Sequence, residues 1–255
     1  MNALLRVDNL TKRFGGLVAI DDCSFAVEAG SITALIGPNG AGKTTVFNLV
    51  AGFMKATSGQ VTFGGRRIDG LAARRIFHLG LCRTFQIPRQ FKEMSVIENV
   101  MIAAVGRSGE YFWSRWLNPG RVARDEEHSF TRAEEVLDFV NLLSHRDQPA
   151  GNLSGGQKKL LELARILMCK PKLILLDEPA AGVNPTLINQ LIGRIETIRR
   201  QFGVTFLIVE HDMDMVARLC DHVIVMAEGR RLTEGAPADV LHDRAVLDAY
   251  LGTSS

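Results

Sequence analysis

The sequence has no long apolar run, and its positive and negative charges nearly cancel. No stretch approaches the ~18 consecutive apolar residues that a membrane-spanning helix needs, and the first residues lack the apolar core of a secretory signal. We therefore expect neither feature. Lys and Arg number 30 and Asp and Glu 28, a net charge of +2. That balance argues against a whole-domain nucleic-acid footprint, although a local basic patch stays possible.

Cysteine is scarce too, and its four copies form no CxxC pair. The wide spacing of the cysteines indicates four small, buried, apolar side chains in a reducing compartment rather than a disulfide framework or a metal site. A composition of 46% hydrophobic and 23% charged residues is ordinary for a globular protein and excludes a disordered or collagen-like chain. The length of 255 residues fits one large domain, or a core domain with a subdomain. The cysteines are Cys23, Cys82, Cys169 and Cys220.

Short apolar strands alternate with amphipathic segments along most of the chain. The pattern predicts strands at 4–10, 23–28, 31–36, 57–65, 81–85, 172–176, 204–209 and 222–226. It predicts helices at 43–51, 71–79, 96–105, 131–143, 155–169, 185–200, 212–219 and 237–251. Residues 106–130 hold both tryptophans among glycines and mixed charges, which predicts an insertion loop with a short helix. This insertion is either a solvated elaboration or a surface that contacts a partner.

A glycine-rich loop follows the strand predicted at 31–36 and precedes a helix. Glycines let backbone N–H groups converge on phosphate oxygens without Cβ clashes, and the helix N-terminus adds its dipole. Lysine then reaches the β- and γ-phosphates of a nucleotide, and a threonine hydroxyl serves Mg²⁺. The loop fits G-x-x-x-x-G-K-[ST] and is followed by a second threonine: Gly37, Pro38, Asn39, Gly40, Ala41, Gly42, Lys43, Thr44 and Thr45.

Two further segments carry chemistry that completes a nucleotide site. The apolar strand 173–176 delivers Asp177, suited to Mg²⁺, and Glu178, suited to act as a general base on water. Ser154, Gly155, Gly156 and Gln157 open a helix and form a second set of N–H donors for phosphate. One chain does not need two such cradles, so each would serve a different nucleotide in a pair of subunits. The alternatives are a capped strand end and an ordinary helix cap with flexible glycines.

The segments GPNGAGKTT, LSGGQ and LILLDEP, with His211 after them, resemble the ATP-binding subunit of ABC transporters over essentially the whole chain. The resemblance implies ATP and Mg²⁺ as ligands and an α/β fold: a P-loop NTPase ABC ATPase core with a mostly parallel sheet, an antiparallel β subdomain and a helical subdomain. The core would span roughly 1–86 and 161–255. The helical subdomain would span roughly 87–160 and contain the 106–130 insertion.

The same resemblance assigns roles to three residues outside these motifs. Gln86 matches the glutamine that contacts Mg²⁺ and the water, and His211 matches the histidine that contacts the γ-phosphate. Phe14 matches the aromatic residue that stacks on adenine. The alternatives are a surface glutamine, a structural histidine and a phenylalanine in the core. Asn184 stands where the family often has Asp, which puts an ionic role for that position in doubt.

Several phrases, among them RTFQIPR at 83–89 and EPAAG at 178–182, resemble the longer ATPase of importers for branched-chain (hydrophobic) amino acids. Urea and short-amide importers carry a similar subunit, and lipopolysaccharide- or lipid-extracting transporters and soluble ABC ATPases are rival assignments. The resemblance implies partners: a second ATPase, with a paralogue favoured over a homodimer, two membrane-spanning permease subunits and, indirectly, a periplasmic or extracellular solute-binding protein. It implies no nucleic acid, and a location at the cytoplasmic face of the cell membrane.

An unusually apolar stretch follows Gln86 and contains Phe91, Met94 and Val96. A segment tied to the γ-phosphate at one end could transmit closure to a membrane subunit through these side chains. The alternative is that they fill the core of the helical subdomain.

Overall fold

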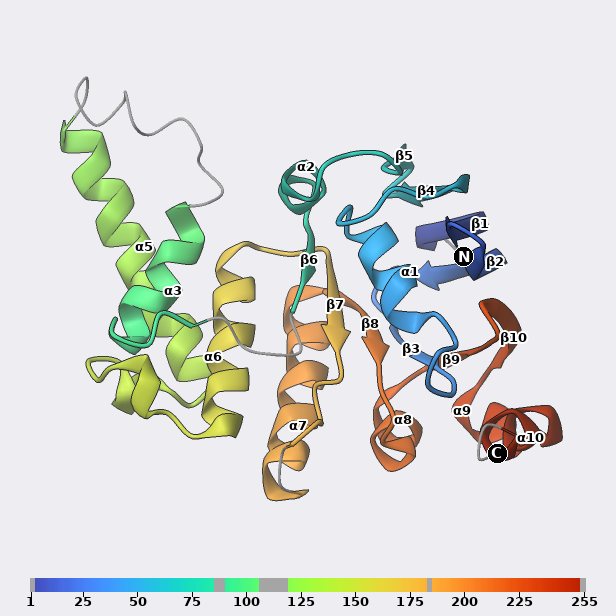
Figure 1. The fold of residues 1–255 in the computed structure, drawn as a ribbon. Coiled ribbons are helices and arrows are strands. Elements are labelled where there is room, and N and C mark those ends of the chain that lie inside the picture. The colour runs from blue at the N-terminus through green and yellow to red at the C-terminus, as the bar shows by residue number, and fades with distance from the viewer. Residues whose placement is uncertain (1–2, 85–89, 106–118, 183–184, 253–255) are drawn as a thin grey trace. The chain divides into compact units, whose positions relative to one another are not determined.

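The computed structural model describes residues 3–84, 90–105, 119–182 and 185–252, which divide into two compact units (Figure 1). The first unit comprises Met1–Arg83, Lys172–Ala181 and Ile188–Ser255 and holds two β-sheets. The second comprises Thr84–Pro171 and Gly182–Leu187 and is helical. Gln86, Asn184 and residues 106–118 lie outside the described residues, so the predictions made for them stay predictions.

The larger sheet of the first unit has the strand order β10-β9-β3-β8-β7-β6 and is parallel except for β10. The central strands β3, β7 and β8 are buried at every position, as expected for parallel strands covered on both faces. The sequence predicts every strand of this sheet except β10. The bounds are β3 Ile32–Ile36, β6 Leu81–Arg83, β7 Leu173–Asp177, β8 Thr205–Val209, β9 His222–Ala227 and β10 Arg230–Gly235.

Alternate residues of these strands pack against different layers, because successive side chains of a strand point to opposite faces. Leu35, Leu207 and Ile224 join a core cluster with α1 (Lys43–Val50) and the smaller sheet. Their neighbours Ala34, Ile36 and Val223 pack on the other face, against Val216, Val240 and Val246 of three C-terminal helices. Those helices are α8 Met213–Leu219, α9 Pro237–Val240 and α10 Arg244–Leu251.

The smaller sheet is antiparallel, in the order β2-β1-β4-β5. Its first two strands are longer than predicted, because they continue to a tight hairpin in which Phe14 pairs with Leu17 across Gly15 and Gly16. A Gly-Gly pair suits such a two-residue turn. The bounds are β1 Ala3–Phe14, β2 Leu17–Glu28, β4 Ser58–Phe63 and β5 Arg66–Arg67; α2 (Ala73–His78) leads to β6, and α7 spans Pro185–Phe202.

The second unit packs α3 (Val96–Val105), α5 (Pro119–Phe139) and α6 (Gly155–Met168) against one another. Two short 3₁₀ turns, η1 (Leu143–His145) and η2 (Ala150–Asn152), join α5 to α6. The predicted boundary at roughly residue 160 lies inside α6. Leu160, Leu161 and Ala164 of this helix are buried, so α6 stays whole within the unit, which continues to Pro171.

The prediction for 106–130, a loop with a short helix, underestimates the helix. Residues 119–130 are helical and belong to α5, which runs on without a break into the predicted helix and ends at Phe139. Proline is tolerated in the first turn of a helix, and the charge run at 124–127 consists mainly of residues with good helix propensity. None of the helices in the described part of the chain combines the length with the apolar composition that a membrane span requires.

Candidate nucleotide site

The glycine-rich loop joins β3 to α1 in the first unit, and close packing explains two of its glycines. A Cβ on Gly37 would lie 2.1 Å from the Met226 carbonyl oxygen, and one on Gly42 would lie 2.5 Å from Ile20 Cδ1. Both residues have positive φ angles, of 146° and 97°. Any larger side chain would therefore push the loop off the neighbouring strands.

Lys43 lies folded over this loop. Its Nζ donates to the carbonyl oxygens of Gly37, at 2.7 Å, and Pro38, at 2.9 Å, and the side chain is buried. Burial lowers the pKa of Lys43 below its ordinary value, because desolvation penalises the ammonium; the negative charges of Glu178 and Asp177 oppose this effect. The ammonium is thus held at the loop in the field of both acids.

The start of α1 is suited to a phosphate group. Within the described part of the chain, no side chain caps this helix, so its first N–H groups keep their capacity to bind an anion. Asn39, Gly40 and Thr44 are exposed, which leaves a ligand room to approach the loop and the threonine hydroxyl. The residues present therefore fit the triphosphate of a nucleotide.

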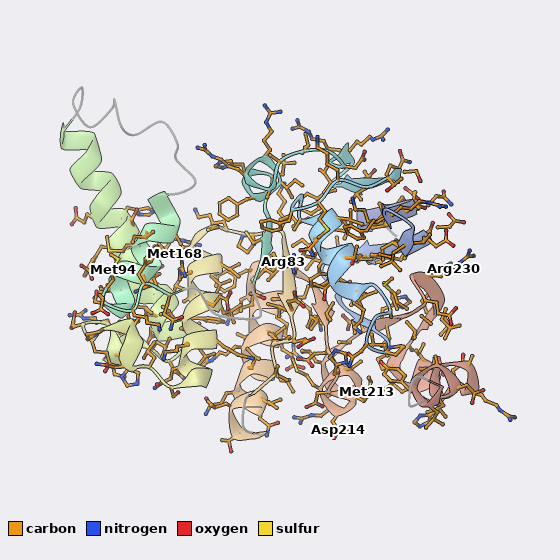
Figure 2. All side chains as sticks on the ribbon, viewed as in Figure 1. Arg83, Met94, Met168, Met213, Asp214 and Arg230 are labelled. Atoms are coloured by element: carbon orange, nitrogen blue, oxygen red, sulfur yellow. The ribbon has the colours of Figure 1, made fainter. Side chains whose placement is uncertain are left out.

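Asp177 ends β7 and is held by an ion pair that the sequence analysis missed. Arg83 of β6 donates through Nη2 to Asp177 Oδ2 at 2.7 Å and through Nη1 to Asn48 Oδ1 at 2.6 Å (Figure 2 labels Arg83). Both charged side chains are less than 10% exposed. The guanidinium also lies 5.6 Å from the centroid of the Phe47 ring. Arg83 therefore fixes the carboxylate that is predicted to hold Mg²⁺.

Glu178 and His211 meet where β7 and β8 end. Glu178 Oε1 lies 3.2 Å from His211 Nε2, and both side chains are partly exposed. The Glu178 backbone has a φ of 48°, an uncommon conformation for a residue with a side chain, and its N–H donates to the Val209 carbonyl oxygen at 2.9 Å. The structure thus brings together the predicted base and the predicted γ-phosphate contact. Strain of this kind often accompanies functional sites.

Glu210 is a buried carboxylate that the sequence analysis also missed. Its Oε1 accepts from the Ala180 N–H at 2.6 Å, and its Oε2 accepts from His211 N–H at 2.9 Å and Asp212 N–H at 3.3 Å. Glu210 therefore ties the turn after Glu178 to the turn that carries His211. An acidic residue directly after an apolar strand is the signal that marks it in the sequence.

The Ser154–Gln157 segment begins α6 in the second unit. Ser154 and Gln157 form a reciprocal capping box, and Ser154 is exposed. A Cβ on Gly156 would lie 2.3 Å from Leu187 Cδ1, so packing explains that glycine. Among the described residues, a Cβ on Gly155 would meet no atom within 4 Å other than its chain neighbours and the backbone of its own helix. Open space there is compatible with a ligand that approaches the helix N-terminus.

Phe14 is 44% exposed, and the Lys12 ammonium lies 4.9 Å from the centroid of its ring. The alternative that Phe14 fills the core is therefore wrong, while stacking on adenine stays a prediction. The prediction for the cysteines agrees with the structure in burial: Cys23, Cys82 and Cys169 are buried and Cys220 is partly buried, all as free thiols.

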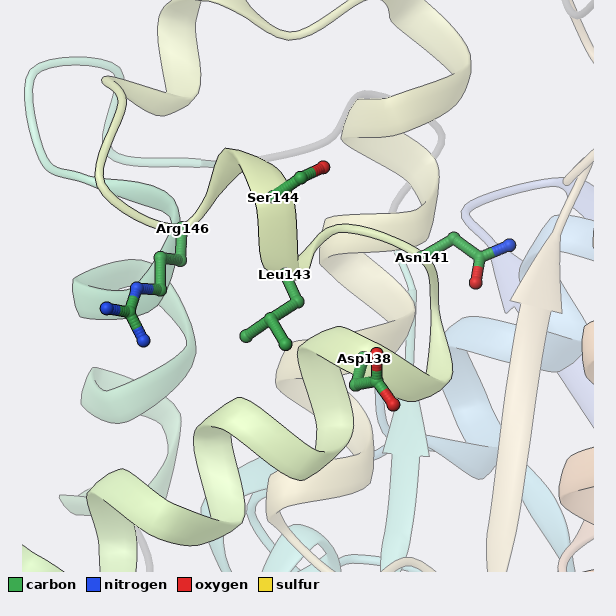
Figure 3. Close-up of a pocket in the computed structure, with 5 residues that line it drawn as sticks. All are labelled: Asp138, Asn141, Leu143, Ser144 and Arg146. Atoms are coloured by element: carbon green, nitrogen blue, oxygen red, sulfur yellow. The ribbon is translucent and has the colours of Figure 1, made fainter.

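Two further observations concern ligands. In the described part of the chain, no group of three or more His, Cys, Asp or Glu side chains could hold a metal ion. The predicted ligands Thr44, Gln86 and Asp177 would therefore share Mg²⁺ with the nucleotide. A shallow hollow on the second unit, lined by Asp138, Asn141, Leu143, Ser144 and Arg146, includes none of the predicted site residues (Figure 3).

Comparison with known proteins agrees with these features. Residues 20–181 match the family model described as ABC transporter, and residues 230–254 match one described as branched-chain amino acid ATP-binding cassette transporter. The chain is 44% identical, over 98% of its length and 95% of the relative's, to a probable branched-chain amino acid transport ATP-binding protein LivG of Archaeoglobus fulgidus. It is 39% identical to the high-affinity branched-chain amino acid transport ATP-binding protein BraF of Pseudomonas aeruginosa, over 98% of both chains.

A solved structure gives the same result for the fold. The crystal structure of the ADP conformation of an ATP-binding cassette of an ABC transporter matches 99% of this chain and 100% of its own. The TM-score is 0.87 and the sequence identity 38%. The predicted fold class, an α/β ABC ATPase core, is thereby confirmed. The chain belongs to the ABC transporter family and is an ATP-binding cassette ATPase of that family.

Proposed function

We propose that this chain binds and hydrolyses ATP to drive the import of branched-chain amino acids or similar small hydrophobic solutes. The contact between Glu178 and His211 is the observation that supports ATP hydrolysis, because it joins the proposed general base to a second polar group. The names of the relatives and the match of residues 230–254 support the solute class. A urea or short-amide importer is the alternative.

The chain's own residues divide the work as follows. Phe14 stacks on adenine, the loop from Gly37 to Thr45 binds the phosphates, and Thr44, Gln86 and Asp177 would hold Mg²⁺. Bound Mg²⁺ would neutralise charge on the phosphate oxygens. Glu178 accepts the proton of the attacking water, and His211 orients that carboxylate and contacts the γ-phosphate. Ser154, Gly155, Gly156 and Gln157 bind the nucleotide of a second ATPase subunit.

We infer that the chain works as a peripheral subunit of a membrane complex. The relatives are named as ATP-binding proteins of transport systems, and a protein of this kind needs a permease to form the passage. In this complex, the chain assembles with two permease subunits and a second ATPase, preferably a paralogue, at the cytoplasmic face of the membrane. A solute-binding protein on the other side would deliver the solute.

The test is to compare Glu178→Gln with Lys43→Ala. Glu178→Gln removes the base but leaves the loop, so it should bind ATP with Mg²⁺ like the wild type and hydrolyse it on the order of 10²-fold more slowly. Lys43→Ala removes a charge on the β- and γ-phosphates and should lose affinity. Fluorescent-nucleotide titration and steady-state phosphate release measure the two effects. Wild-type turnover in Glu178→Gln would remove Glu178 from catalysis.

A further inference from the structure

The side chain of Gln157 makes a contact that the capping box does not require. Its Oε1 accepts from the Ser154 N–H at 2.9 Å, which completes the box with the Ser154 hydroxyl. The other end of the amide, Nε2, lies 2.8 Å from Nε2 of His145. His145 ends η1, nine residues before Ser154 in the chain, and none of the roles assigned above includes it.

The hydrogen-bond chemistry of this contact fixes the protonation of the imidazole. The Ser154 N–H can only donate, so the oxygen of the Gln157 amide must face it. The amide nitrogen, which can also only donate, therefore faces His145. His145 Nε2 must accept, and its proton must reside on Nδ1. A positively charged imidazole would place two donors against each other and break the contact.

Backbone hydrogen bonds hold the turn that carries His145. The N–H groups of Val96 and Ile97, in the first turn of α3, donate to the carbonyl oxygens of Gln148 and Arg146, both at 3.0 Å. The Arg146 side chain, in turn, forms ion pairs with Glu134 of α5 and with Asp147. The turn that carries His145 is thus bonded to α3 and α5. His145 Nε2 therefore contacts Gln157 from a turn whose position is fixed.

We propose that His145 is a positioning residue for the Ser154–Gln157 segment. As a neutral acceptor, it holds the Gln157 amide in the one orientation that closes the capping box. The closed box keeps the exposed Ser154 hydroxyl and the first N–H groups of α6 at a fixed place for a phosphate. The inference rests on the proposed function, because the Ser154–Gln157 segment binds a nucleotide only if that function is correct.

A double-mutant cycle on the full chain tests this role. His145→Phe keeps a ring but loses the acceptor and should lower kcat for ATP hydrolysis about tenfold, the cost of one hydrogen bond, with ATP affinity unchanged. His145→Gln supplies an amide oxygen and should restore kcat. Because His145 acts through Gln157, adding His145→Phe to Gln157→Leu should cost nothing further. Ser144→Ala, an exposed neighbour in the same turn, is the matched control and should behave as the wild type.

Nitrogen NMR of the histidine rings gives a readout that is independent of activity. The expected result is a neutral His145 with its proton on Nδ1, assigned by the loss of that signal in His145→Phe. A proton on Nε2, full activity in His145→Phe, or additive losses in the double mutant would each overturn the role. If the wild-type chain does not hydrolyse ATP, the proposed function is overturned. The positioning role then falls as well, even if NMR finds the His145 proton on Nδ1.

Discussion

Arg83 and Asp177 form a buried ion pair. Because neither side chain is well solvated, each charge needs the other to compensate it. Removing one partner of a buried pair leaves the other charge uncompensated, and that is the costly change. We expect Arg83→Met to lower the free energy of unfolding by about 3–5 kcal/mol, measured by urea denaturation. Adding Asp177→Asn should recover part of the loss, because the orphaned charge is then gone. An Arg83→Met protein as stable as the wild type would contradict this account.

The position of a site residue in the fold could be predicted where it belongs to a contiguous motif, while its role stays a prediction. The sequence placed Lys43 at the loop and Glu178 at the end of a buried strand because both positions are defined by their immediate neighbours. Arg83 and Glu210 were missed for the opposite reason. Their partners, Asp177 and Ala180, are 94 and 30 residues away in the chain, and only the order of strands in the sheet brings them together.

Helices and strands show the same dependence on context. The buried parallel strands are visible in the sequence because they are apolar at every position. β10 was missed because it is an edge strand with the sequence RRLTEG, which has little apolar content and gains its order by pairing with β9. The continuity of α5 could not be predicted, because a charge run in its first part obscures the helical period of apolar residues by which a buried face is recognised.

The two glycines that begin α6 should respond differently to a side chain. Gly156 packs on Leu187, so Gly156→Val should destabilise by about 1–3 kcal/mol through overpacking. Gly155→Ala meets open space and should leave the melting temperature unchanged. If phosphate approaches this point, Gly155→Ala should nonetheless lower ATP turnover. Differential scanning fluorimetry and phosphate release measure the two properties, and a stable Gly156→Val protein would contradict the packing argument.

At the scale of the whole molecule, the chain has two segments that are predicted to bind phosphate, one in each compact unit. If each serves a different nucleotide, the Ser154 cradle acts on a second subunit. Ser154→Arg should then leave ATP binding by the monomer unchanged and lower turnover on the order of 10²-fold, as for the loss of a preorganised donor. Equilibrium binding and steady-state turnover check both expectations.

Mixing two inactive variants tests the same arrangement in dimers of this chain. A dimer of one Ser154→Arg chain and one Lys43→Ala chain contains one site in which both cradles are intact. Mixing should therefore restore turnover that neither variant has alone. If mixing restores nothing while both proteins remain folded, the two cradles do not complement each other across such a dimer.

Phe91 is the residue through which this cassette could act on a membrane subunit. The structure corrects the alternative in which it fills the helical core: the ring is 48% exposed, and the guanidinium of Arg165 lies 5.7 Å from its centroid. Burial lowers the pKa of Arg165, because desolvation penalises its charge. An aspartate at position 91 would meet a cation there rather than an apolar core. The coupling role therefore stays a prediction, and the fold should tolerate the charge.

We expect Phe91→Asp to keep the melting temperature within about 2 °C of the wild type, as for a surface substitution, and to keep ATP hydrolysis by the isolated chain. Assembly with the permease subunits and uptake into vesicles should be lost, because an apolar contact is replaced by a hydrated charge. Phe91→Leu keeps the apolar character and should preserve both. Co-purification with the permease and vesicle uptake separate the two variants. A Phe91→Asp protein that melts several degrees lower without any partner present would assign Phe91 to the stability of the helical unit, and one that still assembles and drives uptake would exclude it from coupling.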